Sequence, residues 1–182
     1  MQFSSLFLSL LTVSSALPLA PRQEQSLAPK LLTTFNDLNT AVADLTTAVN
    51  YFDGSLFSLL PQALAVVKTE AKLDLTILKA TRITDKSANF TAEESTDIVN
   101  TLAGGIGPIQ ASLEALKAKY PIFKKTLTAP IVLLDLKILK KHTDELTDAL
   151  TAKVTADNAG LLGLGKSILD QSFDDAIAVY SA

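Results

Sequence analysis

The sequence predicts an all-α protein, an up-and-down bundle of about five amphipathic helices, some of them kinked. Apolar residues recur three or four positions apart through five segments, and no segment alternates with period two. The connections between these segments are short, which favours antiparallel neighbours. Leu and Ala, which lose little side-chain freedom in a helix, are abundant in the 182 residues, whereas aromatic residues make up only 6%.

The first predicted helix covers residues 27–52, where apolar residues step by three and four positions. Asp53 and Gly54 are turn-forming residues and end this helix. The second predicted helix covers residues 56–78. Because Pro61 lies inside this segment, the helix either begins near Leu60 or kinks there.

The third predicted helix begins with a capping box. Thr91 and Glu94 stand three residues apart, so the hydroxyl and the carboxylate can each accept from an unpaired backbone amide. The helical pattern then continues from Ile98 to Tyr120. The segment 104–108 contains three glycines and a proline, and each glycine costs about 1 kcal/mol relative to alanine. We therefore expect this helix to be kinked or locally opened there.

The fourth and fifth predicted helices follow two further breaks. Pro121 and Pro130 bracket a short link, and Pro130 suits the first position of a fourth helix that extends to Val154. Residues 157–160 contain Asp, Asn and Gly and are predicted to break the chain. The fifth helix then covers residues 162–180.

The N-terminal residues are typical of a secreted protein. Residues 1–16 hold a short apolar stretch followed by small residues, which predicts a signal peptide. Residues 17–23 form an extended leader, and residues 24–182 form a single helical domain. Pro18, Pro21 and Pro29 mark the extended chain before the first helix.

Other sequence features bear on processing and localisation. Arg22 is a candidate processing site, and Asn89 begins the one glycosylation sequon, as expected for a surface loop of a secreted chain. The chain has no cysteine, so its stability depends on packing. No segment is long and apolar enough for a transmembrane helix, and the C-terminus lacks the apolar tail of a lipid-anchor signal. We expect a secreted protein, with loose attachment to a cell wall as the alternative.

Composition excludes several classes of function. The formal net charge is −3, and no basic block exceeds Lys140-Lys141, so nucleic acid is not an expected partner. The single histidine, His142, has no second histidine or cysteine at metal-ligand spacing, so no metal or other cofactor is predicted. His142 therefore flanks the apolar face of its helix or, in the alternative, provides a polar group in a pocket.

One motif resembles a phosphate-binding loop. Gly160, Gly165, Lys166 and Ser167 fit the pattern Gly-x-x-x-x-Gly-Lys-Ser. Such a loop must follow a β-strand, but the preceding residues have helical periodicity. We therefore interpret these glycines as a chain break before the last helix, and we predict no nucleotide site.

Neither the paired acids nor the threonines indicate a catalytic site. Glu93-Glu94 and Asp174-Asp175 are interpreted as charges at helix ends or on solvated helix faces, because neighbouring helical residues do not face each other. Threonines on the helix flanks are interpreted as a weakly charged surface with hydroxyls bonded to backbone carbonyls. The alternative is a surface mild enough to adsorb to apolar material.

Several short motifs, joined to the secretion signal and the cysteine-free bundle, carry a family resemblance. They are Asp53-Gly54, Thr91-Ala92-Glu93-Glu94, Leu113-x-x-Leu116, Lys124-Lys125, Leu133-x-x-Leu136-Lys137, His142-Thr143 and Ala176-Ile177-x-x-Tyr180. Over residues 24–182 the chain resembles the fungal hydrophobic surface-binding protein A family, which includes cell-wall galactomannoproteins. The resemblance implies a secreted or wall-associated protein that binds hydrophobic surfaces, and some members enclose fatty acids within a helical bundle. It implies no catalytic residues.

The function expected is a secreted, non-enzymatic binder of hydrophobic ligands or surfaces. The leading hypothesis is a fatty acid or other apolar small molecule held in a cavity or groove of the bundle. The alternative is an adhesive protein that coats hydrophobic surfaces and recruits a secreted hydrolase. A lipid hydrolase is not predicted, because the chain has no Gly-x-Ser-x-Gly motif.

The expected binding site surrounds the glycine-rich break in the third helix. Glycines at 104, 105 and 107 remove side-chain volume, so an apolar void could remain between the helices. The alternative is that these glycines only permit close helix approach. The predicted lining residues are Leu64, Val67, Leu102, Ile106, Ile109, Phe173 and Ile177.

Overall fold

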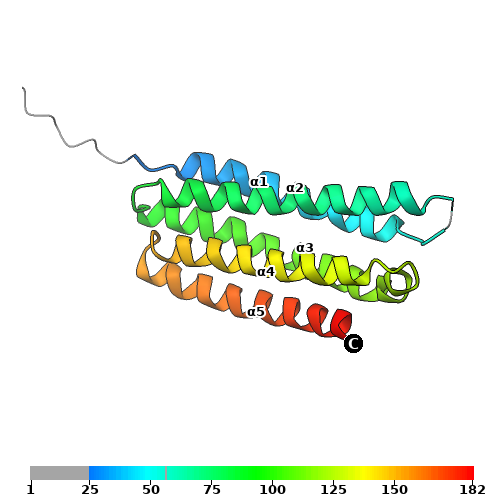
Figure 1. The fold of residues 1–182 in the computed structure, drawn as a ribbon. Coiled ribbons are helices and arrows are strands. Elements are labelled where there is room, and N and C mark those ends of the chain that lie inside the picture. The colour runs from blue at the N-terminus through cyan, green and yellow to red at the C-terminus, as the bar shows by residue number, and fades with distance from the viewer. Residues whose placement is uncertain (1–24, 56) are drawn as a thin grey trace, which may run out of the picture.

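The computed structural model describes residues 25–55 and 57–182, and these residues contain five helices and no strand. The helices are α1 (Ala28–Tyr51), α2 (Leu59–Asp85), α3 (Ala92–Lys125), α4 (Ala129–Thr151) and α5 (Ala156–Ser181). Successive helices run in opposite directions along one long bundle (Figure 1). The predicted all-α, up-and-down bundle is confirmed. The predicted signal peptide, the leader of residues 17–23 and Arg22 lie outside the described residues.

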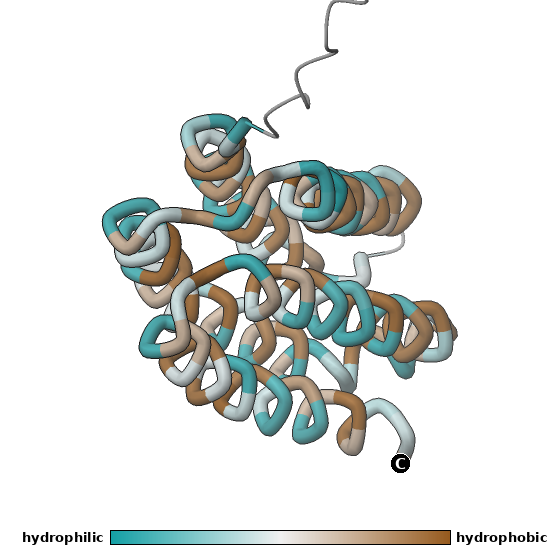
Figure 2. The backbone as a smooth tube through the Cα atoms, turned by 90° about the vertical axis from the view of Figure 1, so that its left-hand side faces the viewer, coloured by the Kyte–Doolittle hydropathy of each residue, from teal (hydrophilic) through white to brown (hydrophobic). Residues whose placement is uncertain are grey.

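The five helices form a closed ring around a common interior. α1 packs on α2 and α3, α5 packs on α3 and α4, and α2 packs on α4. The order around the ring is therefore α1, α2, α4, α5, α3. The view along the bundle shows the five helices around this interior, with hydrophobic segments on each of them (Figure 2). Within the described part of the chain, no helix has a stretch apolar and long enough to span a membrane.

The end of the first helix agrees with the prediction. α1 ends at Tyr51, and Gly54 adopts a φ of +71°, a conformation that side-chain-bearing residues rarely adopt. A Cβ at Gly54 would also lie 2.6 Å from Cγ2 of Ile122 in α3. Gly54 thus lets the α1–α2 loop lie directly against the C-terminal end of α3.

The predicted N-terminal cap of α3 is also confirmed. The Thr91 hydroxyl accepts from the Glu94 amide at 3.2 Å, and the Glu94 carboxylate accepts from the Thr91 amide at 2.9 Å. Ser26, just before α1, donates a further hydrogen bond to this carboxylate at 2.7 Å and lowers the pKa of Glu94. The cap therefore also connects the start of α3 with the start of α1.

The predicted local opening of the third helix is wrong. α3 continues through the segment 104–108 and through Pro121, and the link to α4 is only residues 126–128. Gly104, whose carbonyl stands four residues before Pro108, is exposed, so water can satisfy that carbonyl. Packing against α1 and α5 on the other side outweighs the weak helix propensity of the glycines.

Two other boundaries differ from the sequence-based expectation, and a third agrees with it. α5 begins at Ala156, so residues 157–160 form its first turns and the break is at 152–155. Asp157 is favourable in that first turn because it faces the positive end of the helix dipole. Pro29, expected in the leader, lies in the first turn of α1, where its missing amide costs nothing. α2 begins at Leu59, which confirms the start near Leu60 and places Pro61 in its first turn.

Threonine hydroxyls bond back to the helix backbone, as predicted. Thr33, Thr47 and Thr151 each donate to the carbonyl four residues earlier, at 2.8–3.0 Å. This pairing satisfies the hydroxyls without surface charge.

One end of the bundle interior is filled by four aromatic residues, Phe52, Tyr120, Phe123 and Tyr180, which we call the aromatic layer. The Phe52 and Phe123 rings stack with centroids 4.4 Å apart, and the Tyr120 and Tyr180 rings meet edge to face at 5.0 Å. The Tyr180 hydroxyl donates to the Leu116 carbonyl at 2.7 Å, so its polar atom is paired although the ring is buried. The aromatic layer closes the bundle beside the α1–α2 and α3–α4 loops.

Candidate ligand cavity

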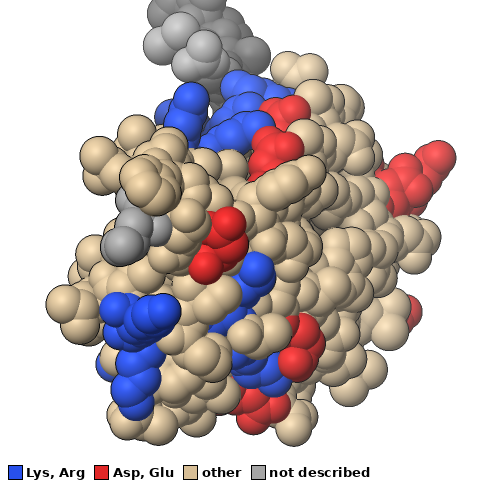
Figure 3. Space-filling model, turned by 90° about the vertical axis from the view of Figure 1, so that its right-hand side faces the viewer, with Lys and Arg blue, Asp and Glu red and all other residues tan. Residues whose placement is uncertain are grey.

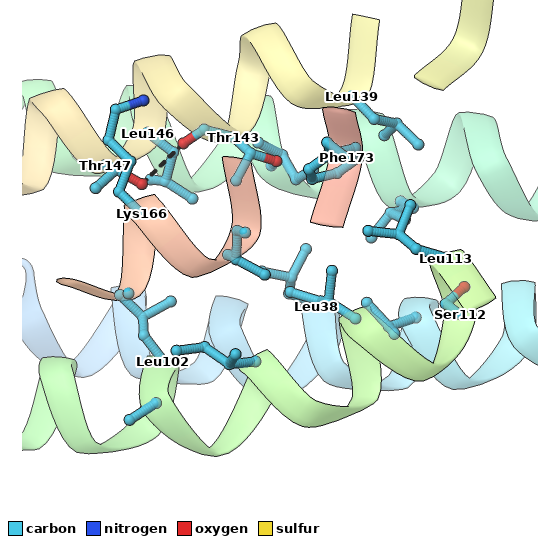
Figure 4. A pocket seen from close by; sticks show the side chains of 18 of the residues that line it. Leu38, Leu102, Ser112, Leu113, Leu139, Thr143, Leu146, Thr147, Lys166 and Phe173 are labelled. Atoms are coloured by element: carbon cyan, nitrogen blue, oxygen red, sulfur yellow. Dashed lines mark hydrogen bonds between the residues drawn. The ribbon is translucent and has the colours of Figure 1, made fainter. Parts of the chain in front are cut away.

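A cavity of about 110 Å³ lies inside the ring, between the aromatic layer and the opposite half of the bundle. All five helices contribute to its wall, and nearly all of the lining side chains are apolar (Figure 4). The principal lining residues are Leu38, Val42, Leu45, Leu73, Ile77, Val99, Leu102, Ile106, Ile109, Leu113, Leu116, Leu139, Leu146, Leu150, Leu162, Leu169 and Phe173.

The structure places the predicted site residues in two different regions. Leu102, Ile106, Ile109 and Phe173 line the cavity. Ile177 packs against the core beside it and is not part of the lining.

Leu64 and Val67 do not reach the interior. Their side chains are 65% and 46% exposed, and α2 contributes Leu73 and Ile77 to the cavity wall instead. α2 carries apolar residues on two faces. Leu64 and Val67 were predicted from the periodicity of the face that is exposed in the structure. The buried face is Val66, Leu73, Ile77, Ala80 and Ile83.

The glycines of α3 do not create the cavity. A Cβ at Gly104 or Gly107 would meet nothing within 4 Å, and both residues are exposed. Gly105 is buried, and a Cβ there would lie 2.9 Å from Oδ1 of Asn39 in α1. A Cβ at Gly165 of α5 would lie 3.3 Å from Cδ1 of Ile106. Gly105 and Gly165 thus permit close helix approach, and the void lies where inward side chains are aliphatic.

Lining residues from α1 and α4 were predicted to be apolar helix faces but not cavity walls. Leu38, Val42 and Leu146 are buried, as their spacing indicated, whereas the burial of Leu139 was not predicted. Periodicity identifies the inward face of a helix, but it carries no information on whether the facing side chains meet across the centre.

Polar groups lie at both ends of the cavity. Thr143, Thr147 and Lys166 stand at one end and Ser112 at the other (Figure 4). The Thr147 hydroxyl donates to the Thr143 carbonyl at 2.9 Å. Ser112 is 4% exposed, and its Oγ has no hydrogen-bond partner among the described residues.

The cavity opens between α3 and the first half of α5. Leu161 is 54% exposed and also lines the cavity, as does the exposed Ala103 on the α3 side. The first half of α5 contains the glycines at 160, 163 and 165, and Leu162 is its one buried residue. This part of the wall is therefore thinly packed.

Ion pairs hold α5 on α4 beside this opening. Lys166 pairs with Asp144 of α4 and, at 3.6 Å, with Asp170. Lys140 of α4 pairs with Asp174 at 2.7 Å and Asp170 at 3.8 Å. Desolvation raises the pKa of Asp170, and the hydrogen bond and negative charge of Asp144 raise it further. Because three carboxylates already surround two lysines, this cluster has no excess positive charge for an acidic ligand.

A second polar cluster lies on the α2–α4 side of the cavity wall. His142 Nδ1 lies 2.5 Å from Oδ1 of Asp74, and neither residue lines the cavity. Desolvation, together with the charges of Asp135 and Asp74, raises the pKa of Glu70 to about 7. Desolvation and Asp74 likewise raise the pKa of Asp135. Within the part of the chain that the structure describes, no group of three or more His, Cys, Asp or Glu residues is placed to hold a metal ion.

The phosphate-loop motif has a structural role. Residues 160–167 lie within α5, which follows α4 directly, and no strand precedes them in the described residues. Lys166 is paired with carboxylates and Gly165 contacts Ile106, so the motif serves helix packing. The prediction that these glycines break the chain is wrong, because the helix begins four residues before Gly160.

Large apolar side chains are exposed at the end of the bundle that holds the aromatic layer. We call this surface the exposed apolar end, and Figure 3 shows it as a wide uncharged area with charged groups in small clusters. Leu127 is 84% exposed and has a φ of 60°, a strained conformation for a leucine. The members of the exposed apolar end are Tyr51, Phe57, Leu60, Leu64, Val67, Leu127, Ile131 and Leu134.

The fold and the site define an all-α protein in which a ring of five helices encloses an apolar cavity. The chain belongs to the Hydrophobic surface binding protein A family, whose sequence model matches residues 28–152. The family resemblance predicted from the short motifs is thereby confirmed. No curated protein matches the chain.

Solved structures share this fold over most of the chain. The crystal structure of Afmp4p in complex with palmitic acid is 33% identical, with a TM-score of 0.80 over 84% of this chain and 99% of that one. Ligand binding domain 1 of the Penicillium marneffei MP1 protein, complexed with arachidonic acids, is 13% identical, with a TM-score of 0.76 over 86% and 98%. Domain 2 of the same protein has a TM-score of 0.72 at 14% identity, over 85% and 95%. At such low identity the two MP1 domains support the fold alone.

Proposed function

We propose that the chain binds fatty-acid-like molecules in the cavity between its five helices. The observation that carries this proposal is an apolar cavity with polar groups only at its two ends. The similarity to a protein that holds palmitic acid supports the same class of ligand.

Binding a long chain requires the cavity to expand. Its volume of about 110 Å³ is below the roughly 150 Å³ of an engineered cavity that holds benzene. The thinly packed first half of α5 is the part of the wall that can yield with the least loss of buried contacts. A ligand therefore enters beside Leu161 and separates α5 from α3.

The proposed action is binding without a chemical step. His142 is paired with Asp74 outside the cavity, so it does not face the proposed ligand. We propose that the protein is secreted, on the basis of the signal-peptide pattern in residues 1–16 and the sequon at Asn89, which lies exposed in the α2–α3 loop. The similar Afmp4p structure is a complex with palmitic acid, which favours this carrier over an adhesive protein that recruits a hydrolase.

Filling the cavity tests the proposal. Leu113 is buried in the cavity wall, so Leu113→Trp places an indole in the space that the ligand needs. Leu64→Trp is the matched control, because the same substitution falls on the exposed face of α2. We expect Leu113→Trp to abolish saturable binding of a fluorescent fatty acid, whereas Leu64→Trp binds like the parent. Circular dichroism checks that both variants remain helical, and tight binding by a folded Leu113→Trp would contradict the cavity site.

The exposed apolar end favours a second function, adsorption to hydrophobic surfaces. Retaining a strained, exposed leucine at 127, where glycine is the usual residue, is unfavourable for folding and provides apolar surface. The double variant Leu60→Ser and Leu127→Ser should weaken adsorption to octadecyl-coated silica about tenfold. The double variant Leu161→Ser and Leu164→Ser, which alters exposed leucines of α5, is the control. Equal losses in both would show that no particular end is responsible.

A further inference from the structure

Ser112 differs from the other buried hydroxyl-bearing residues of the helices, Thr34, Thr84 and Ser95, whose hydroxyls are hydrogen-bonded. Thr84 is equally buried, and its hydroxyl donates to the Ala80 carbonyl at 3.0 Å. Ser172 and Ser181 likewise bond to the carbonyl four residues earlier. The Ser112 hydroxyl makes no such bond and lines the cavity instead.

An unpaired buried hydroxyl is unfavourable for folding, because it loses its hydrogen bonds to water and gains none. Alanine at position 112 would fill nearly the same space without that cost. The hydroxyl borders open volume, so a group that enters the cavity can reach it. Its position therefore suits a polar atom of the ligand.

We propose that Ser112 Oγ binds the head group of the ligand and that this head group is an uncharged hydroxyl, as in a long-chain alcohol or an undissociated fatty acid. This inference rests on the proposed binding of an apolar chain in the cavity. It adds the orientation of the chain and the charge state of its head group.

The surroundings of Ser112 exclude a charged head group. One neutral hydroxyl cannot compensate for the burial of an ionised carboxylate. Lys166 is the one charged residue in the described lining, and it is already paired with Asp144 and Asp170. Lys166 is also distant, because Gly165 contacts Ile106 and Ser112 follows Ile106 by six residues, about 9 Å along a helix.

The closed end of the cavity sets the direction of the chain. Leu116 follows Ser112 by one turn, and its carbonyl accepts from Tyr180 of the aromatic layer. The aromatic layer therefore closes the bundle on this side of Ser112, whereas the opening lies at the other end, beside Leu161. The head group thus lies deep, and the apolar chain extends toward the mouth.

Variants at Ser112 test the head-group assignment with three probes of equal chain length, cetyl alcohol, hexadecane and palmitate. The purified, delipidated protein carries Ser112→Ala, Ser112→Thr or, as a control outside the cavity, Ser172→Ala. We expect Ser112→Ala to weaken cetyl alcohol binding about five- to tenfold and to leave hexadecane binding unchanged. Ser112→Thr restores the preference for the alcohol, and Ser172→Ala matches the parent.

Palmitate tests the charge state. At about pH 4 it behaves like the alcohol and is sensitive to Ser112→Ala, whereas at about pH 8 it binds more weakly and is insensitive. In the absence of ligand, Ser112→Ala should raise Tm, because it removes the unpaired hydroxyl.

Three outcomes overturn the inference. Equal losses for alcohol and alkane in Ser112→Ala would assign Ser112 a packing role only. Undiminished alcohol binding would place the head group elsewhere. Failure of the parent protein to bind any of the three probes would instead remove the proposed function itself.

Discussion

The aromatic layer and the cavity occupy adjacent lengths of the same ring of helices, yet one is filled and the other is hollow. In the aromatic layer, Phe52, which follows α1, and the rings of α3 and α5 meet across the interior at centroid distances of 4.4–6.2 Å. Along the cavity most lining residues are Leu, Ile and Val, and Phe173 is the one aromatic residue in the described lining. The inward side chains therefore differ in size between the filled level and the hollow level of the bundle.

This difference separates two tasks within one fold. The aromatic layer provides buried contact area and a closed end, and the aliphatic level provides space for a ligand. A chain of low aromatic content can do both because it concentrates four of its eleven Phe and Tyr residues at one level.

The largest expected effect comes from making the filled end hollow. Phe123 is 2% exposed and stacks on Phe52, so Phe123→Ala removes a ring from a close-packed level. We expect the free energy of unfolding to fall by about 3–5 kcal/mol, measured by urea denaturation.

The matched change in the hollow level is Leu113→Ala. Leu113 is also buried, but one side of its side chain already faces the void, so fewer contacts are lost. We expect a loss of about 2 kcal/mol, the low end of the range for such truncations. A loss as large as that of Phe123→Ala would mean that the cavity is collapsed in solution.

The next expected effect concerns the polar cluster of Glu70, Asp74, Asp135 and His142, which lies on the α2–α4 side of the cavity wall. Burial raises the pKa of Glu70 from its usual 4.5 to about 7, so the folded protein holds a proton that the unfolded chain has released. The stabilisation that comes from the proton on Glu70 is therefore fully present below about pH 4.5 and is lost as the pH rises through about 7. After allowance for its half-exposed position, Glu70→Gln should raise the free energy of unfolding by about 1–2 kcal/mol at about pH 8 and by little at about pH 4.

Glu145→Gln provides the control for this effect. Glu145 lies on the exposed face of α4 beside Lys141, so the same change in net charge occurs away from the cluster. Equal responses of the two variants to pH would assign the effect to net charge rather than to the burial of Glu70.

The smallest effect is expected at the surface of the filled end. Leu127 has a φ of 60° and an exposed side chain, so Leu127→Gly relieves strain and removes few contacts. We expect a gain of about 0.5–1 kcal/mol in the free energy of unfolding, since glycine also has more freedom to lose. Thr126→Gly is the contrasting variant, because Thr126 has a negative φ and its hydroxyl donates to the Ile122 carbonyl. Thermal unfolding of both variants should therefore shift in opposite directions.

The sequence predicts the helices more reliably than their boundaries or the cavity. Apolar spacing identifies five helices because burial of one face dominates their stability. Gly104–Pro108 and residues 157–160 contain helix-breaking residues, but tertiary packing and a favourable first turn keep both segments helical. Leu64 and Val67 were assigned to the interior because α2 has two apolar faces, and only the neighbouring helices decide which one is buried. Ser112 offers no local signal, since its missing partner is visible only in three dimensions.

The two halves of α5 are unequally secured, and amide hydrogen exchange should reveal this inequality. Phe173, Ala176 and Tyr180 anchor the second half in the core, whereas the first half has one buried residue, three glycines and the ion pairs of Lys166 with Asp144 and Asp170. Backbone amides of the first half should exchange through local opening, without unfolding of the whole chain. Salt weakens the ion pairs and should accelerate that exchange. The rate at which a ligand enters or leaves would then depend on ionic strength, although the cavity wall is almost entirely uncharged.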